Sequence, residues 1–160
     1  MIPRYYFKSA ARVTPDWLAE RGAKAVIVDL DNTLLPRFTE EVPAELRVWI
    51  DSLHAAGIGV VLLSNNHRGR VGRYARLLSV IGVANAVKPL PFGFLRALRA
   101  LGTTRHETVM VGDQFFTDML GAALLGLTSV MVLPLSKRDL AHTLILRKLE
   151  GLFMRQRQAQ

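Results

Sequence analysis

Short apolar runs and longer amphipathic segments alternate along the chain. Runs rich in Val, Ile and Leu, each bounded by turn residues, predict buried strands, and the segments between them have apolar residues at helical spacing. The predicted strands are 25–30, 58–63, 84–87, 107–112 and 128–133, and the predicted helices are 15–21, 43–56, 68–81, 91–101, 116–126 and 137–154. This alternation is typical of a doubly wound, Rossmann-like α/β fold, with a mostly parallel sheet of about five strands and helices on both faces.

Length and composition fit one domain of ordinary size. The 160 residues, 50% of them hydrophobic, suffice for one core, so we expect a single domain over residues 1–160. No apolar stretch reaches the roughly 20 residues that cross a bilayer, and the start of the chain lacks a signal-peptide core. Together with the absence of cysteine, this favours a cytoplasmic protein.

Two carboxylates stand at the end of the first predicted strand. Asp29 and Asp31 follow a buried apolar run, and in an extended strand both point to the same side. Burying unpaired carboxylates is costly, so their position indicates a bound cation and a chemical role. The alternative is a strand followed by an Asp-Asn turn, because Asp and Asn are common turn residues.

Other strand ends carry matching polar groups. Ser64 and Asn65 follow the second strand, Lys88 lies where the third strand ends, and Asp113 follows the fourth. Ligands of open α/β sheets bind outside the carboxyl ends of the strands, so these side chains should converge on one pocket. Carboxylate oxygens suit Mg²⁺, and a lysine with hydroxyl donors suits phosphoryl oxygens. The pattern therefore predicts phosphoryl transfer.

These motifs together resemble the haloacid dehalogenase (HAD) superfamily of phosphatases, whose four motifs are present in order. Within it, the chain looks like the YqeG-type subfamily IIIA phosphatases over nearly its whole length, and that group is similar to the mitochondrial phosphatidylglycerophosphate phosphatases. The matching positions are Asp29, Asp31 and Thr33 in the first motif, Ser64 in the second, Lys88 in the third, and Gly112, Asp113, Thr117 and Asp118 in the fourth.

The resemblance implies a hydrolase that works through an aspartyl-phosphate. Asp29 would be the nucleophile, and Asp31 would protonate the leaving oxygen and then activate water. Mg²⁺ would be held by Asp29, the carbonyl of Asp31 and Asp113, while Ser64 and Lys88 would bind phosphoryl oxygens.

Three residues have two interpretations each. Asp118 either supports the metal shell or is a carboxylate favoured by the dipole at a helix N-terminus. Thr33 and Asn65 either bind phosphate and support the site, or belong to a turn or a helix cap.

The spacing between motifs leaves no room for a cap domain over the site. An open site favours a bulky phosphorylated substrate, such as a lipid head group, a protein or a nucleic-acid end, or else a homo-oligomer whose partner covers the mouth. The resemblance makes phosphatidylglycerophosphate one candidate substrate.

The charge of the chain is strongly basic, +8 at neutral pH. Arg68, Arg70, Arg73 and Arg76 follow the second motif with no acid among them, and we expect the first turn of their helix near the pocket mouth. They either capture a large anion or form a solvated helix face. Both termini mix apolar and basic residues, which predicts either contact with an anionic membrane or packing against the sheet.

Two other functions fit the same fold. A basic nucleic-acid-binding module is one, although the chain has no zinc pattern or aromatic RNA-binding signature, so no specific nucleic acid is expected. A phospho-acceptor signalling domain is the other. Asp31 argues against it, because a simple acceptor lacks a general acid and base two residues after the nucleophile.

Overall fold

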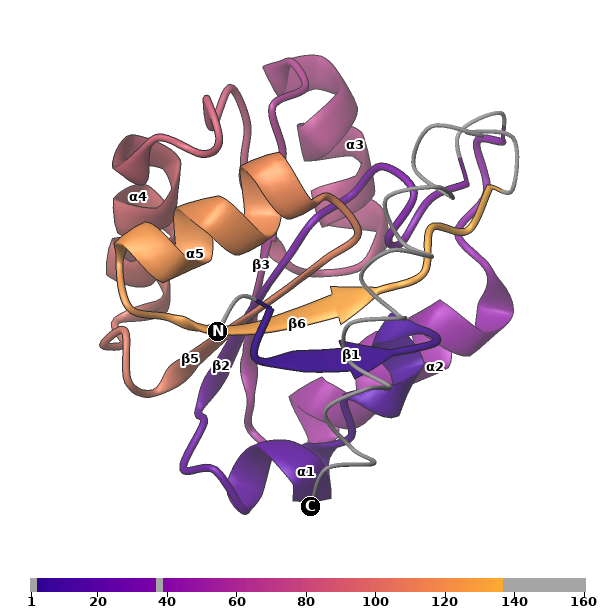
Figure 1. Cartoon of the computed structure of the whole chain (residues 1–160). Coiled ribbons are helices and arrows are strands. Elements are labelled where there is room, and N and C mark those ends of the chain that lie inside the picture. The colour runs from indigo at the N-terminus through magenta and orange to yellow at the C-terminus, as the bar shows by residue number, and fades with distance from the viewer. Residues whose placement is uncertain (1–2, 37–38, 137–160) are drawn as a thin grey trace.

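The computed structural model describes residues 3–36 and 39–136, and in these ranges six parallel strands form one sheet (Figure 1). Their order across the sheet is β1-β6-β5-β2-β3-β4. The strands are β1 (Tyr5–Phe7), β2 (Ala25–Val28), β3 (Gly59–Leu63), β4 (Ile81–Val83), β5 (Thr108–Gly112) and β6 (Thr128–Val132). The central strands β2, β3 and β5 are almost entirely buried, as expected for a parallel sheet covered on both faces.

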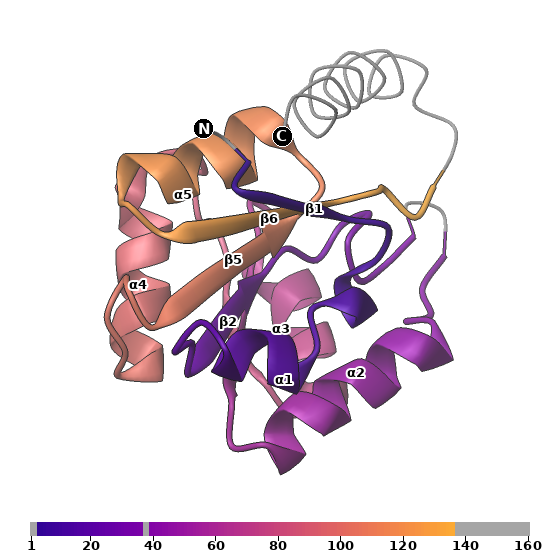
Figure 2. The same ribbon diagram turned by 60° about the horizontal axis from the view of Figure 1, so that its bottom comes forward.

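Helices cover both faces of the sheet (Figure 2). Side chains of α1, α2 and α3 share one apolar cluster with alternate strand residues such as Val28 and Val111, and α4 and α5 share the other with Ile27 and Met110. The helices are α1 (Pro15–Ala19), α2 (Ala44–Ala55), α3 (Arg68–Leu77), α4 (Pro91–Leu101) and α5 (Leu120–Leu124), with a 3₁₀ turn η1 (Ala10–Arg12) and a π-helical turn η2 (Phe115–Met119).

The predicted order of elements is confirmed in the described residues, with two differences and one additional strand. The predicted strand 84–87 is wrong: the strand is β4, three residues earlier, and Asn85 and Val87 have positive φ values of 47° and 55° that no strand accommodates. The predicted helix 116–126 is divided into η2 and α5. The predicted helix 137–154 lies outside the described residues.

An additional edge strand, β1, was not predicted. It pairs with β6, and the rings of Tyr5 and Phe7 meet Trp17 edge to face at centroid distances of 5.0 and 5.5 Å. Of the two interpretations of the N-terminal segment, packing against the protein is therefore the one found for residues 5–7, whose aromatic rings lie against α1. The basic and apolar C-terminal stripe lies beyond the described residues.

The connections beside the site are short. One loop leads from Leu35 to α2, and only α3 and β4 separate Ser64 from Lys88. In the described part of the chain no cap domain is inserted at either place, as the spacing predicts. None of the described helices combines the length and apolar character that crossing a bilayer requires.

Candidate active site

The pocket lies at the carboxyl ends of β2, β3 and β5. The sheet aligns Val28 with Val111, and the main-chain N–H of Asp29 donates to the carbonyl of Val111 at 3.0 Å. This register brings Asp29, one residue past β2, level with the end of β5 and with Asp113. Apart from Thr108 at the start of β5, the side chains of these three strands are apolar, so the polar side chains near the pocket appear where the strands end.

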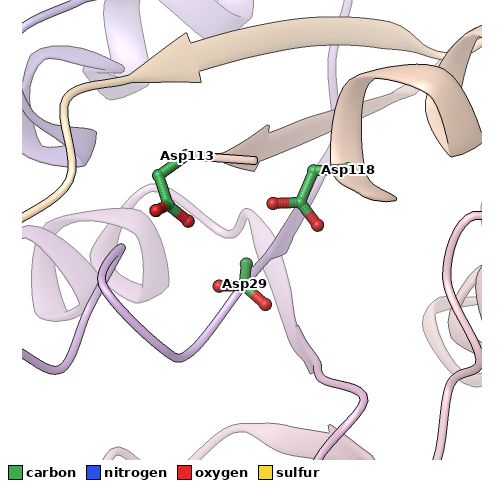
Figure 3. Close-up of side chains that lie close together, drawn as sticks. All are labelled: Asp29, Asp113 and Asp118. Carbon is green, nitrogen blue, oxygen red and sulfur yellow. The ribbon is translucent and has the colours of Figure 1, made fainter. Parts of the chain in front are cut away.

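Three buried carboxylates meet at this edge (Figure 3). Asp29, Asp113 and Asp118 each offer an oxygen within 4.8 Å of the others, and each is at most 3% exposed. Asp118 arrives from η2, whose single turn directs its side chain back over Gly112. A Cβ at position 112 would lie 2.6 Å from Asp118 Cγ, so only glycine leaves room for this carboxylate.

Lys88 connects two of these carboxylates. Its Nζ donates to Asp29 Oδ1 at 2.5 Å and to Asp118 Oδ1 at 2.6 Å. Burial opposes the charged ammonium, but the carboxylates of Asp118 and Asp29 outweigh that effect and raise the pKa of Lys88. Asp118 also accepts the main-chain N–H of Gln114 through Oδ2 at 3.2 Å. Both of its oxygens are therefore occupied by protein donors, and it fixes the position of Lys88.

The other two carboxylates each keep a buried oxygen without a donor. Asp29 Oδ2 and Asp113 Oδ2 have no hydrogen-bond partner among the described residues. Burial raises the pKa of Asp29 to about 7 against the attraction of Lys88, and burial together with the charges of Asp29 and Asp118 raises that of Asp113 to about 8. Two unpartnered hard oxygens in a region of excess negative charge are the donor set that a divalent cation such as Mg²⁺ fits.

Asp31 has a different environment. Its side chain is 30% exposed, and it receives donors on both oxygens. Arg70 donates to Oδ1 from Nε at 3.3 Å and from Nη2 at 3.1 Å. Asn66 donates to Oδ2 from its amide at 2.9 Å, and Ser64 Oγ lies 3.4 Å from the same oxygen. Asp31 thus stands at the pocket wall rather than in the carboxylate cluster.

Thr33 and Asn65 contact the protein instead of pointing freely into the pocket. Thr33 is 1% exposed, and its hydroxyl donates to Asp113 Oδ1 at 3.2 Å. The side-chain amide of Asn65 donates to the carbonyl of Lys88 at 3.2 Å and accepts the main-chain N–H of Lys88 at 2.7 Å. Thr33 therefore orients a carboxylate, and Asn65 holds the backbone of the lysine.

Several of these side chains line a pocket of about 280 Å³, whereas Thr33, Asp113 and Asp118 are not among its lining residues. Five of its lining residues were predicted from the sequence: Asp29, Asp31, Ser64, Asn65 and Lys88. Asn66, Gln114 and Thr117 line it as well. Asn66 lies among the polar residues that follow the second predicted strand and Thr117 is a position of the fourth motif, but the sequence assigned neither of them, nor Gln114, a role in the site. Arg70 was placed near the mouth by the sequence, but its contact with Asp31 was missed. The position of Arg70 in the first turn of a helix that follows Ser64 was the available signal.

Comparison with known proteins agrees with this geometry. Residues 44–126 match the family model of haloacid dehalogenase-like hydrolases. The chain is 33% identical to the "Probable phosphatase YqeG" of Bacillus subtilis (strain 168) over 138 residues, which are 86% of this chain and 80% of that protein.

Two solved structures share the fold. An uncharacterized protein from Listeria monocytogenes serotype 4b aligns with a TM-score of 0.57 and 19% identity, over 78% of this chain and 98% of that one. The cobalt-bound deoxy-D-mannose-octulosonate 8-phosphate phosphatase (YrbI) from Haemophilus influenzae aligns with a TM-score of 0.51 and 19% identity, over 58% of this chain and 60% of that one. The chain belongs to the haloacid dehalogenase-like hydrolases and is a phosphatase of the YqeG type.

Proposed function

We propose that the protein is a Mg²⁺-dependent phosphomonoesterase that acts through a phosphorylated Asp29. The observation that carries the proposal is the pair of buried, unpartnered oxygens on Asp29 and Asp113 beside the ammonium of Lys88. Asp29, Asp113 and the carbonyl of Asp31 would hold the cation. When bound, Mg²⁺ offsets the repulsion between anionic enzyme and anionic substrate and stabilises charge on the transferred group.

In the first step a carboxylate oxygen of Asp29 attacks phosphorus, and the bond from phosphorus to the leaving oxygen breaks. Asp31 donates a proton to that oxygen, and the product leaves as an alcohol. In the second step Asp31 takes a proton from water, the water oxygen attacks phosphorus, and the bond to Asp29 breaks. Inorganic phosphate leaves, and both side chains return to their starting state.

Lys88, Ser64 and main-chain amides are suited to bind the phosphoryl oxygens. Lys88 uses two of its three N–H donors on Asp29 and Asp118, so one is left for a substrate. None of the hydrogen bonds between described residues uses the main-chain N–H of Leu30, Asp31 or Asn65. Asp31 and Asn65 line the pocket, and Leu30 lies in the sequence between the lining residues Asp29 and Asp31, so these three amides are suited to act as preorganised donors for an anion.

The first experiment is phosphate release with an aryl phosphate and Mg²⁺. Asp29→Asn should abolish turnover and leave the fold intact, while Asp51→Asn, at an exposed carboxylate on α2, should have no effect. EDTA should stop the reaction, and added Mg²⁺ should restore it. Multiple turnovers would exclude a signalling domain, in which the phosphoryl group persists on the protein. Activity that survives Asp29→Asn would contradict the mechanism.

For the substrate we propose an amphipathic anion, with phosphatidylglycerophosphate in an anionic membrane as the leading candidate. Val87 and Leu90 flank Lys88 in the sequence and are 56% and 47% exposed, and Phe116, 64% exposed, precedes the lining residue Thr117. Residues 52–106 contain eight Lys and Arg but no Asp or Glu. Three of these cations, Arg70, Arg73 and Lys88, pair with acids from other parts of the chain, and the segment still has an excess of positive charge. Exposed apolar groups together with this basic segment favour a ligand that is both anionic and apolar.

A substrate panel tests this class. It compares phosphatidylglycerophosphate in anionic vesicles with an aryl phosphate, a phosphopeptide and a 5′-phosphorylated oligonucleotide. Leu90→Ser and Phe116→Ser should lower kcat/KM for the lipid but not for the aryl phosphate. Val48→Ser is the control, because Val48 is 66% exposed and lies on α2, which packs on the other face of the sheet from α4. Equal losses on both substrates would count against a lipid, and preference for the oligonucleotide would favour the nucleic-acid alternative.

A further inference from the structure

Asp31 is held more firmly than its exposure suggests. Guanidinium donors of Arg70 reach one carboxylate oxygen, and the amide of Asn66 reaches the other. Donors on both oxygens from two different directions fix the side-chain torsions, whereas one hydrogen bond leaves the group free to rotate. The group that transfers the proton therefore has a defined orientation before a substrate arrives.

The local sequence explains why Arg70 is available for this contact. His67 caps α3, and its ring Nδ1 accepts the main-chain N–H of Arg70 at 3.4 Å. Arg70 therefore stands in the first turn of the helix, beside the end of β3 and facing Asp31. Its side chain is 23% exposed, so solvent competes little with the ion pair.

Arg70 is itself supported from behind. Glu40, in the loop that leads to α2, lies 3.5 Å from Arg70 Nη1 and 2.5 Å from Arg73 Nη1. The hydroxyl of Tyr74 donates to the main-chain carbonyl of Glu40 at 3.0 Å and contacts its carboxylate at 3.2 Å, and Tyr74 is fully buried. A chain of contacts thus connects the orientation of Asp31 to a side chain in the core.

We propose that Arg70 is a positioning residue, which holds Asp31 in the orientation needed to give a proton to the leaving oxygen and to take one from water. The inference rests on the proposed function of Asp31. Proton transfer requires the carboxylate within hydrogen-bond reach of the reacting oxygen, and a misplacement of about 1 Å can cost roughly a hundredfold in rate. Arg70 contributes by holding the carboxylate of Asp31 in this position, and it does not contact the phosphoryl group.

A competing role for Arg70 is direct binding of an anionic substrate. The geometry favours positioning, because three of its donor nitrogens face the carboxylates of Asp31 and Glu40. The two roles differ in kinetics. Loss of a substrate contact raises KM, whereas loss of placement lowers kcat and leaves KM nearly unchanged.

The test is a double-mutant cycle between positions 31 and 70, with kcat and KM measured on an aryl and an alkyl phosphate. Arg70→Met should lower kcat by roughly 10- to 100-fold with KM within about twofold. The loss should be larger for the alkyl phosphate, whose poor leaving group depends more on the acid. In the Asp31→Asn background, Arg70→Met should have no further effect, because Arg70 acts through Asp31.

Two more variants complete the design. Arg99→Met removes an exposed cation in the last turn of α4, outside this chain of contacts, and it should keep wild-type kinetics. Arg70→Lys keeps the charge without the two-nitrogen fork, so it should recover part of kcat, and it also serves if the Met variant folds poorly. Thermal melting of each variant separates lost placement from lost fold.

The possible outcomes distinguish failure of the positioning role from failure of the proposed function. A rise in KM with kcat unchanged, or equal effects of Arg70→Met in the wild-type and Asp31→Asn backgrounds, would overturn the positioning role while leaving the phosphatase mechanism standing. Failure of the proposed function itself is seen separately, as a wild-type rate equal to that of Asp29→Asn. In that case there is no reaction in which Asp31 transfers a proton, and the positioning role of Arg70 is refuted together with the proposed function.

Discussion

Gly112→Ala is the substitution that most directly tests the arrangement of the carboxylates. The added methyl would lie 2.6 Å from Asp118 Cγ and 2.8 Å from its Cβ. Ordinary carbon contacts are about 3.5–4.0 Å, so Asp118 has to retreat by about 1 Å, and rotation of the carboxylate alone does not relieve the contact with Cβ. Asp118 Oδ1 is 2.6 Å from Lys88 Nζ, and a displacement of that size breaks this hydrogen bond.

The expected cost follows from these two effects. Overpacking in a tight interior costs about 1–3 kcal/mol, and loss of a hydrogen bond between charged groups costs about 1.5–3 kcal/mol. We therefore expect Gly112→Ala to lower the free energy of unfolding by about 2.5–6 kcal/mol and to lower phosphatase activity, because Lys88 loses one of its two anchors. Urea denaturation gives the first quantity and phosphate release the second.

Gly72→Ala is the matched control. Gly72 lies inside α3, and a Cβ there would meet only Arg76 Nη1, at an ordinary 3.5 Å. The same substitution should therefore stabilise the protein, by about 0.5–1 kcal/mol, because alanine favours the helix. If the free energy of unfolding of Gly112→Ala were within about 0.5 kcal/mol of the wild-type value, the close packing of Asp118 against the backbone of Gly112 would be refuted.

Three further predictions concern the proposed metal site and the backbone beside it. In EDTA, the raised pKa values of Asp29 (about 7) and Asp113 (about 8) mean that the folded protein binds their protons more tightly than the unfolded chain does, with its value of 3.8. Stability from this source is complete below pH 3.8 and is lost as the pH rises through 7 to 8; urea denaturation should show that fall, and a flat profile would contradict it. Thr33→Val should weaken Mg²⁺ binding by roughly 10- to 100-fold in calorimetry, because Asp113 loses the donor that orients it, and unchanged affinity would remove that role. Val87→Gly should raise the unfolding free energy by about 1 kcal/mol, since Val87 is β-branched with a φ of 55°, and a loss of stability would show that its side chain packs usefully.

The strand ends explain why most of the pocket was predictable. A buried parallel strand is a continuous apolar run, so the polar residue that ends it is visible in the sequence, as at Asp29, Ser64 and Asp113. Parallel strands bring those ends to one edge whatever the exact register. Lys88 was also identified, although the strand expected before it is displaced by three residues, because the turn after β4 still delivers it to the same edge.

Contacts that depend on a side chain's direction were not predictable. The first turn of the helix that follows Ser64 contains both Arg68 and Arg70, and its position near the pocket does not show which of the two contacts Asp31. Thr33 and Asn65 belong to motifs of the site, yet their hydrogen bonds to Asp113 and to the Lys88 backbone depend on torsions that the sequence does not specify. The edge strand β1 was missed because three half-buried aromatic residues carry too short a pattern for a strand assignment.

The route of the chain through the pocket has a consequence for how the protein is made. The Lys88–Asp29 contact joins residues 59 positions apart, and the Thr33–Asp113 contact joins residues 80 positions apart. Contacts of such range form late, because the intervening chain must be ordered first. A nascent chain that ends before β5 has Asp29 but neither Asp113 nor Asp118. Ligands that need these carboxylates therefore bind only chains that include β5 and η2 in the folded sheet, and binding draws the folding equilibrium toward them.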